Sequence, residues 1–156
     1  MTKNQVERIL QFYRTIPDEI KLYAEERAEF NDYYNPLQSP VVDGMPHDTN
    51  ASDQTANAAL RSGEYEYAAK RVEEIEKYIT TLERIATEVF GSLKALPYYE
   101  KMTVYRFYLD GWSWAKVSFA LRYSEVQCRR IRNNAIVKLA DLFSDNQIIF
   151  SFNYPK

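Results

Sequence analysis

Hydrophobic positions along most of this chain recur at three- and four-residue spacing, which is typical of amphipathic helices. The pattern predicts a first helix over about residues 2–33. Pro17 lies inside that segment and predicts either a kink or a break into two shorter helices. Glycine is scarce, with 4 in 156 residues. The periodicity therefore predicts an all-α fold.

A second long helix is expected to start with a cap at Ser52 or Asp53 and to run to about residue 92. An interruption at Ser62 and Gly63 is the alternative to one continuous helix. Its apolar stripe has the alternating spacing of a coiled-coil seam and consists of Val72, Ile75, Ile79, Leu82, Ala86 and Val89. This stripe fits two arrangements equally well, namely packing against the first helix of the same chain or forming the seam of a homodimer.

Residues 34–52, between these helices, contain three prolines and clustered turn-forming residues. They predict a long loop within a helical hairpin. His47 lies there near Asp43, Asp48 and Asp53, but the four residues lack the spacing of a metal site. We interpret them as turn and cap residues, and we expect neither a metal nor another cofactor.

Pro97 separates the long helix from a C-terminal region in which shorter helices are predicted over about 98–109, 113–121 and 124–143. The last two, joined by a short turn, have the pattern of a helix-turn-helix. The sequence ends in IIFSFNYPK, whose alternation predicts a short extended segment that docks on the body.

This pattern predicts three parts. Residues 1–93 would form a helical, coiled-coil-like scaffold that also serves oligomerisation, 94–143 a helix-turn-helix domain, and 144–156 a tail. Charge divides in the same place: residues 1–93 carry a formal charge of −7 and residues 94–156 carry +5. A local basic region of this kind is what binding to nucleic acid requires, although the whole chain is slightly acidic.

The helix predicted over 124–143 has two distinct faces. Ser124 is a good N-cap, and Gln127 completes a capping box, so the helix should begin at residue 125. At about 100° per residue, the predicted core face consists of Cys128, Ile131, Ala135, Leu139 and Leu142. The opposite face presents Val126, Arg130, Asn133 and Val137, with Arg129 beside them.

The outward face carries the chemistry that reads base edges in a DNA major groove. Arginine pairs with guanine, asparagine with adenine, and an apolar group with the thymine methyl. Arg129 has Glu125 four residues before it, whereas Arg130 and Arg132 have no acidic residue at that spacing. We expect further contacts, to phosphates, from Lys101, Arg106, Lys116, Arg122 and Gln127. Arg132 lies nearer the core and is predicted to make a phosphate or a structural contact.

Residues 98–142 resemble region 4 of bacterial sigma factors, on the pattern GWSWAKVSFALRYSEVQCRRIRNNAIVKL. Position by position, the resemblance implies base-reading residues at Glu125, Val126, Arg129 and Arg130. The turn position that is often glycine is Arg122 in this chain. If that position requires a positive φ, arginine is unfavourable there.

The chain as a whole is similar to phage-encoded transcriptional regulators of the RinA/ArpU type. The likeness rests on the order of the segments and on the stretch GMPHDTNASDQTANAA. It implies double-stranded DNA as the partner and activation of late genes, including packaging and structural genes, with contact to the host RNA polymerase. A homodimer in the cytoplasm of a bacterial host, associated with the nucleoid, is expected.

Two other functions remain open at this stage. The sigma-like module could bind RNA polymerase or a sigma factor as a protein-interaction module, or the chain could be a small terminase subunit, whose DNA-binding module usually comes first. An enzyme is not expected, because the sequence has neither a phosphate-binding glycine loop nor a nucleophile motif. A lone cysteine, Cys128, excludes an intramolecular disulfide. No segment has the apolar length of a membrane span or a signal peptide.

Overall fold

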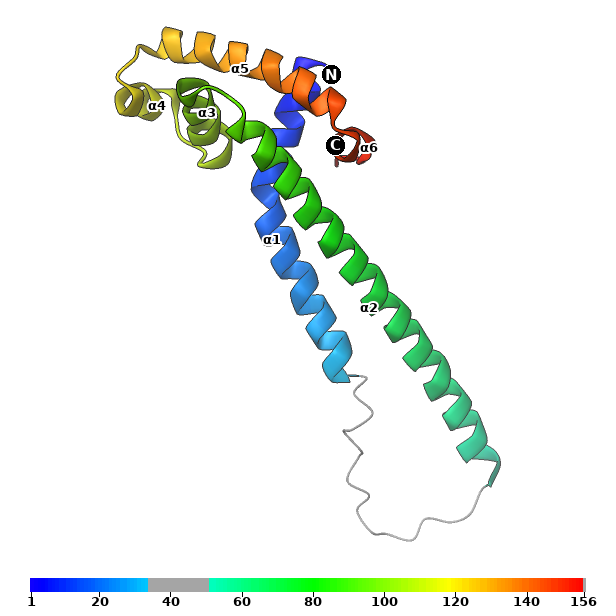
Figure 1. The fold of residues 1–156 in the computed structure, drawn as a ribbon. Helices are drawn as coiled ribbons and strands as arrows, with labels where there is room; N and C mark the ends of the chain where they lie inside the picture. The colour runs from blue at the N-terminus through cyan, green and yellow to red at the C-terminus, as the bar shows by residue number, and fades with distance from the viewer. Residues whose placement is uncertain (34–50, 156) are drawn as a thin grey trace. The chain divides into compact units, whose positions relative to one another are not determined.

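The structure is a computed structural model that describes the backbone of residues 1–33 and 51–155 and the side chains of residues 1–32 and 63–155. Within these ranges the fold is all-α, as predicted (Figure 1). The predicted loop over 34–52 and the cluster around His47 lie almost wholly outside the described residues. No helix in the described ranges is long and apolar enough to cross a membrane.

The two long helices are each continuous. Helix α1 spans Lys3–Tyr33 and passes through Pro17, so the alternative of two shorter helices is wrong. Ile16, next to the proline, is 2% exposed, and Ile20 and Tyr23 beyond it are half-buried. This packing outweighs the backbone bond that Pro17 cannot make. Helix α2 spans Ala51–Lys94 without a break at Ser62 and Gly63.

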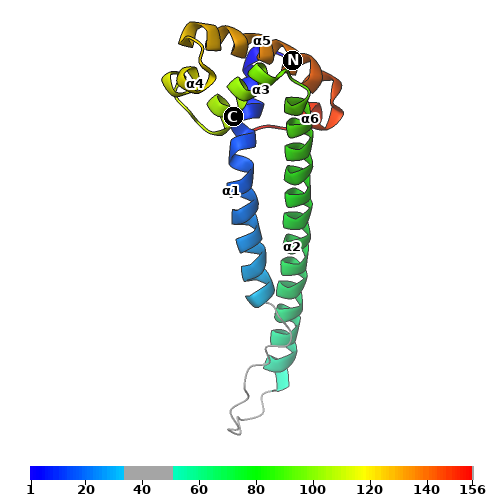
Figure 2. The same cartoon turned by 60° about the vertical axis from the view of Figure 1, so that its left-hand side comes forward.

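The chain forms two compact units, of which one comprises Ile20–Thr80. There the second half of α1 and the first part of α2 run antiparallel, as Figures 1 and 2 both show. The Tyr23 and Tyr78 rings lie 4.8 Å apart, and Arg71 donates to Glu26 over 2.8 Å. Ile75 is buried on the α2 side of this pair. Apolar packing within one chain therefore occupies this part of the predicted seam.

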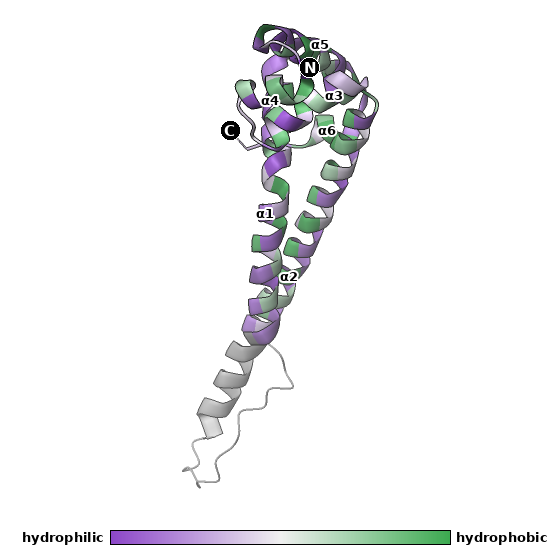
Figure 3. Cartoon of the chain, turned by 90° about the vertical axis from the view of Figure 1, so that its left-hand side faces the viewer, coloured by the Kyte–Doolittle hydropathy of each residue, from purple (hydrophilic) through white to green (hydrophobic). Residues whose placement is uncertain are grey.

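The other unit joins Met1–Glu19 to Thr81–Lys156. It contains the rest of the seam, where Leu82 and Val89 are fully buried, together with the shorter helices. In Figure 3 hydrophobic positions recur between hydrophilic ones along α1 and the described part of α2. The first turns of α1 thus belong to the same compact unit as the predicted helix-turn-helix segment.

Three helical segments follow α2 before the longest C-terminal helix. Helix α3 spans Tyr98–Val104 and continues into a π-helical turn, η1, at Tyr105–Leu109. Helix α4 spans Trp114–Leu121. The prediction of a single helix over 98–109 missed the wider turn, in which the Asp110 N–H donates to the Tyr105 carbonyl over 3.1 Å.

Helix α5 spans Glu125–Asp145, and a short helix α6 at Gln147–Ser151 follows it. The extended tail predicted from IIFSFNYPK is therefore wrong. Asn146 caps α6, because its side-chain oxygen accepts from the N–H groups of Ile148 and Ile149 over 3.1 and 3.2 Å. Docking of the tail is confirmed, since Ile149 is fully buried and the Phe152 ring lies 5.4 Å from that of Phe12.

Candidate nucleic-acid interface

A three-residue turn, 122–124, joins α4 to α5. Arg122 ends α4 in the left-handed region, with φ of 58° and ψ of 37°, and the Tyr123 N–H donates to the Ser118 carbonyl over 3.2 Å. This geometry confirms the expectation that a glycine-type position is occupied by arginine. Ser124 then caps α5, since its hydroxyl accepts from the Gln127 N–H over 3.2 Å.

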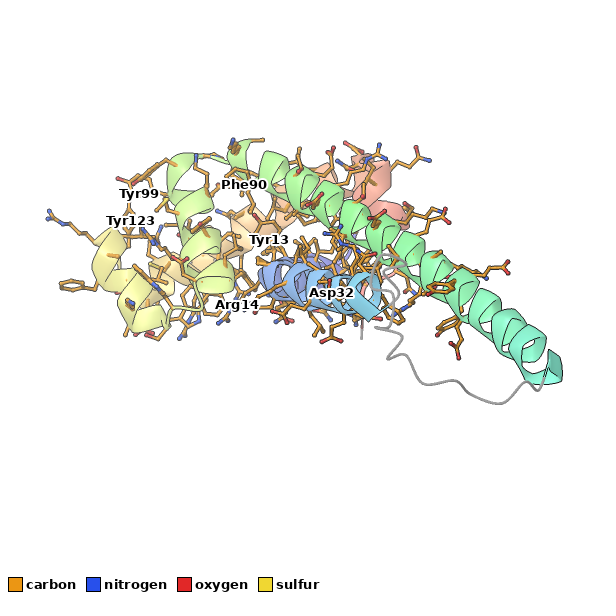
Figure 4. The ribbon with its side chains drawn as sticks, turned by 90° about the horizontal axis from the view of Figure 1, so that it is seen from below. Tyr13, Arg14, Asp32, Phe90, Tyr99 and Tyr123 are labelled. Atoms are coloured by element: carbon orange, nitrogen blue, oxygen red, sulfur yellow. The ribbon has the colours of Figure 1, made fainter. Side chains whose placement is uncertain are left out.

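The loop that leads into α4 passes close to Arg14 at Gly111. Gly111 has φ of +68°, and a Cβ there would lie 2.7 Å from a terminal nitrogen of Arg14. Arg14 comes from α1 (Figure 4). Ser113 caps α4 by accepting from the Lys116 N–H over 3.4 Å. Glycine is thus favoured at residue 111 by its backbone conformation, and the close approach of Arg14 uses the space that it leaves.

The inward face of α5 matches the predicted core. Cys128, Ala135 and Leu139 are fully buried, whereas Ile131 and Leu142 are half-buried. Burial extends to a neighbouring row that the pattern did not include, consisting of Ile136, Ala140 and Phe143. The wider apolar stripe arises because α5 packs on α3, α4 and α6 rather than on one neighbour.

The outward face of α5 is exposed, as predicted. Val126 is 59% and Val137 is 65% exposed, and Arg129, Arg130 and Asn133 are also exposed. Among the residues that the structure describes, no carboxylate lies within ion-pair distance of Arg130. The face therefore brings an unpaired cation, an amide and apolar groups together on one side of one helix.

Arg129 is exposed but already has a partner. Its guanidinium lies 3.2 Å from the Glu125 carboxylate and 5.6 Å from the centre of the Trp114 ring. Both side chains of the ion pair are about half exposed, so the pair contributes little to stability and can exchange partners at small cost. Glu125 and Arg129 thus form a loosely held pair at the edge of the outward face.

Arg132 points the other way and is held inside the unit. One of its terminal nitrogens donates to Glu7 over 2.7 Å and to the Tyr108 hydroxyl over 3.0 Å. Burial raises the pKa of Tyr108 to about 12, although the hydrogen bond from Arg132 opposes the shift. Arg132 therefore joins α5 to α1 and η1, which favours the structural rather than the phosphate alternative for this residue.

Two of the remaining candidates for phosphate contacts, Arg106 and Lys116, flank Trp112, a residue that the sequence pattern did not single out. The Arg106 guanidinium and the Lys116 ammonium lie 4.4 and 4.1 Å from the centre of its ring. Arg106 is also paired with Asp110 over 2.7 Å. Lys116, Arg122 and Gln127 are exposed, and Lys101 is half-buried. Two tryptophans beside a basic helix were the signal that could have identified this cluster.

The described residues offer no metal centre, because they contain no group of three or more histidine, cysteine or acidic side chains suited to hold an ion. Cys128 is fully buried, and burial raises the pKa of its thiol. A buried thiol of this kind is a poor nucleophile and a poor metal ligand. Its environment agrees with the interpretation of Cys128 as a core residue.

Comparison with known proteins yields no match: no protein-family model, curated protein or solved structure matches this chain.

Proposed function

We propose that this protein is a sequence-specific DNA-binding regulator that inserts the outward face of α5 into the major groove. The observation that carries the proposal is Arg130, an exposed cation without a carboxylate partner among the described residues, between Val126 and Asn133 on one face. On a solvated helix face, an acidic residue at i±4 can stabilise such a cation by pairing with it. Here the neighbouring side chains are instead those that recognise base edges.

The local geometry supports a helix-turn-helix. A short helix, a three-residue turn and a capped second helix follow one another at 114–121, 122–124 and 125–145, and the N-terminal turns of the second helix carry the proposed reading residues. We assign base contacts to Val126, Arg129, Arg130 and Asn133, with Glu125 as the exchangeable partner of Arg129.

Phosphate contacts are proposed for the cations outside the reading face. Lys116 and Arg106, held over Trp112, and Arg122 in the turn are the strongest candidates. Gln127 and Lys101 are weaker ones. Arg132 is left out of the proposed interface, because its guanidinium is bound to Glu7 and Tyr108.

The biological setting of the proposal comes from the resemblance to RinA/ArpU-type regulators. It supports promoter binding in a bacterial cell by a phage-encoded protein, and activation of late genes. A homodimer is part of the proposal, because helix-turn-helix proteins commonly bind two half-sites. The buried residues of the α2 seam are not free for that contact, so other surface would have to form it.

The test is a gel-shift assay with a DNA duplex that the wild-type protein selects from a randomised pool. We expect the Arg129→Ala, Arg130→Ala double variant to lose binding while its far-ultraviolet circular dichroism and melting curve stay unchanged. The matched control is the Arg8→Ala, Arg84→Ala variant, which removes two exposed cations outside the reading face and should keep most of the affinity.

Two results would remove the proposal. One is unchanged binding by the double variant. The other is failure of the wild-type protein to select any duplex, with no binding that weakens as salt rises, because phosphate contacts make protein–DNA affinity fall steeply with salt concentration. The second result would favour the protein-interaction alternative, for which the exposed aromatic side chains near the turn, Phe119 at 87% and Tyr98 at 62%, are the supporting observation.

A further inference from the structure

A second surface lies on the unit that carries α5, and it shares only Lys101 and Arg106 with the proposed DNA contacts. The C-terminal end of α2 and the α3–η1 segment enclose a groove of about 260 Å³. Its floor is apolar and is formed by Phe90, Leu93 and Met102, with Tyr105 beside them. Phe90 belongs to α2 (Figure 4) and is 39% exposed, so part of this floor faces solvent.

The rim of the groove is cationic. Lys94 and Lys101 come from opposite walls, and Arg106 completes the lining. The Lys94 ammonium lies 4.6 Å from the centre of the Phe90 ring. Among the described residues, neither lysine has a carboxylate within ion-pair distance, whereas Arg106 is paired with Asp110. Two of the three cations at the rim are thus free to bind an anionic partner.

The hydrogen-bonding groups of the lining are nearly all donors. Lysine and arginine side chains donate and cannot accept, and only the Tyr105 hydroxyl can do both. Among the side chains that the structure describes, no carboxylate or amide lines the groove. A complementary ligand must therefore supply acceptors or negative charge above an apolar group of one or two bulky side chains, which is the size that this volume accommodates.

We propose that this groove is a docking site for an acidic amphipathic peptide segment of a partner protein. An apolar anchor, such as a phenylalanine or leucine side chain, would occupy the floor between Phe90 and Met102. Carboxylates flanking the anchor would pair with Lys94 and Lys101. Binding of an amphipathic segment in a groove between helices is a common recognition mode, and the thioether of Met102 can adapt to differently shaped anchors.

Duplex DNA fits this surface less well than a peptide does. A phosphate backbone would satisfy the lysines but offers no apolar group for the floor, which would remain exposed or be buried against a charged chain. The site therefore goes beyond the proposed DNA-binding function, and the candidate phosphate contacts Lys101 and Arg106 are the residues that the two surfaces share. Residues 125–133, which carry the proposed reading face, take no part in lining the groove.

The experiment measures fluorescence anisotropy of a labelled twelve-residue helical peptide that carries one phenylalanine and one leucine four residues apart, flanked by glutamates. Two comparison peptides replace either the two apolar residues by serine or the glutamates by lysine. We expect the wild-type protein to bind the first peptide at least tenfold more tightly than either comparison peptide. Equal binding of all three would overturn the proposal, and so would absence of binding.

Protein variants locate the site. Lys94→Glu combined with Lys101→Glu should weaken peptide binding at least tenfold, and Phe90→Ala should weaken it severalfold. The matched control is Arg8→Glu combined with Arg84→Glu, which changes the net charge equally at exposed positions outside the groove. An equal loss in the control variant would show that only net charge matters and would overturn the proposal.

Two further outcomes assign the groove to another occupant and also overturn the proposal. The first is a change of molecular mass in light scattering for the Lys94→Glu, Lys101→Glu variant without a change in peptide affinity, which would identify a contact between copies of this chain. The second is loss of DNA binding by that variant with peptide affinity retained. The Arg129→Ala, Arg130→Ala variant should bind the peptide normally, so failure of the DNA-binding proposal and failure of this one are distinguishable.

Discussion

Arg130 and Arg132 lie two residues apart on α5, yet their surroundings are opposite. Arg130 is exposed and has no carboxylate partner among the described residues, whereas Arg132 is bound to Glu7 and to the Tyr108 hydroxyl. Two residues correspond to about 200° around a helix, so one arginine faces out and the other faces in. Counting arginines along the sequence therefore overestimates the positive charge that α5 presents to solvent. Of these two residues, only Arg130 is free to bind a partner.

The largest expected effect is the difference in stability between a substitution on the buried face of α5 and one on its exposed face. Leu139 is fully buried and Val137, two residues earlier, is 65% exposed. We expect Leu139→Ala to lower the free energy of unfolding by about 3 kcal/mol because it leaves a cavity. Val137→Ala should change it by less than about 0.5 kcal/mol. Thermal melts of the two variants check this, and similar losses in both would contradict the assigned faces.

The second-largest expected effect is the difference in stability between the variants that remove Arg132 and Arg130. Arg132→Ala removes the closer of the two cations that pair with Glu7, and Lys3 remains at 3.8 Å. Since the Arg132 and Glu7 side chains are 17% and 25% exposed, the cost should be about 2 kcal/mol, below that of a fully buried pair. Arg130→Ala should cost less than about 0.5 kcal/mol but should weaken DNA binding. Chemical denaturation and the gel shift measure these two quantities. If Arg132→Ala and Arg130→Ala lost stability and DNA affinity in the same proportion, the distinction between a structural and a DNA-binding arginine would be contradicted.

A third prediction concerns the pH dependence of stability that arises from Tyr108, whose hydroxyl accepts a hydrogen bond from Arg132. The pKa of Tyr108 is about 12 in the folded protein, against about 10 for an exposed tyrosine in the unfolded chain. The protonated Tyr108 hydroxyl therefore makes its full contribution to the free energy of unfolding below pH 10. This contribution is lost as pH rises toward 12, because the unfolded chain releases the proton at a lower pH than the folded protein does. We expect Tyr108 to contribute a loss of about 1 kcal/mol between pH 10 and pH 11.

Denaturation midpoints of the wild-type protein and of Tyr108→Phe, measured at several pH values from 9 to 11.5, isolate this contribution. The phenylalanine variant should be less stable at pH 9, since it lacks the acceptor for Arg132, but its stability should fall less steeply above pH 10. Parallel curves for the two proteins would show that Tyr108 does not titrate differently in the folded and unfolded states.

The smallest expected effect lies in the turn that leads into α5. Arg122 has φ of 58°, so Arg122→Gly should raise the free energy of unfolding by about 1 kcal/mol by relieving the left-handed conformation. Gly111→Ala, at φ of +68°, is the reverse substitution and should lower the free energy of unfolding by a similar amount. Thermal melts measure both.

Arg122→Gly has a second readout in DNA binding. If Arg122 contacts a phosphate, as we propose, the slope of log affinity against log salt should become shallower by about 1 in the glycine variant. A more stable protein with an unchanged salt slope would confine Arg122 to a structural role in the turn.

Much of the fold could be predicted from periodicity. The two long helices, the cap at Ser124 and the outward positions Val126, Arg130 and Asn133 agree with the structure. These features depend on local spacing and on side chains within one turn of each other, which a sequence contains directly. The left-handed backbone at Arg122 is expected on a different ground, namely the resemblance to sigma region 4, in which that turn position is often glycine.

Periodicity was insufficient where an interaction joins distant residues. The tail forms α6 rather than an extended segment because Asn146 caps it and Ile149 finds a buried site. Helix α1 continues through Pro17 because its apolar stripe is buried up to Ile16 and half-buried at Ile20 and Tyr23 beyond the proline. In both cases tertiary packing outweighs the local preference.

The sequence by itself determined the helical class, the start of α5 and the division of that helix into an apolar and a polar face, because each follows from spacing along one helix. Only the tertiary structure decided which arginine is free, since the partners of Arg132 come from residues 7 and 108. It also decided that a cationic rim surrounds an apolar groove between α2 and the α3–η1 segment. The charge environment and the burial of a side chain depend on its neighbours in space, whereas the sequence gives directly only its neighbours along the chain.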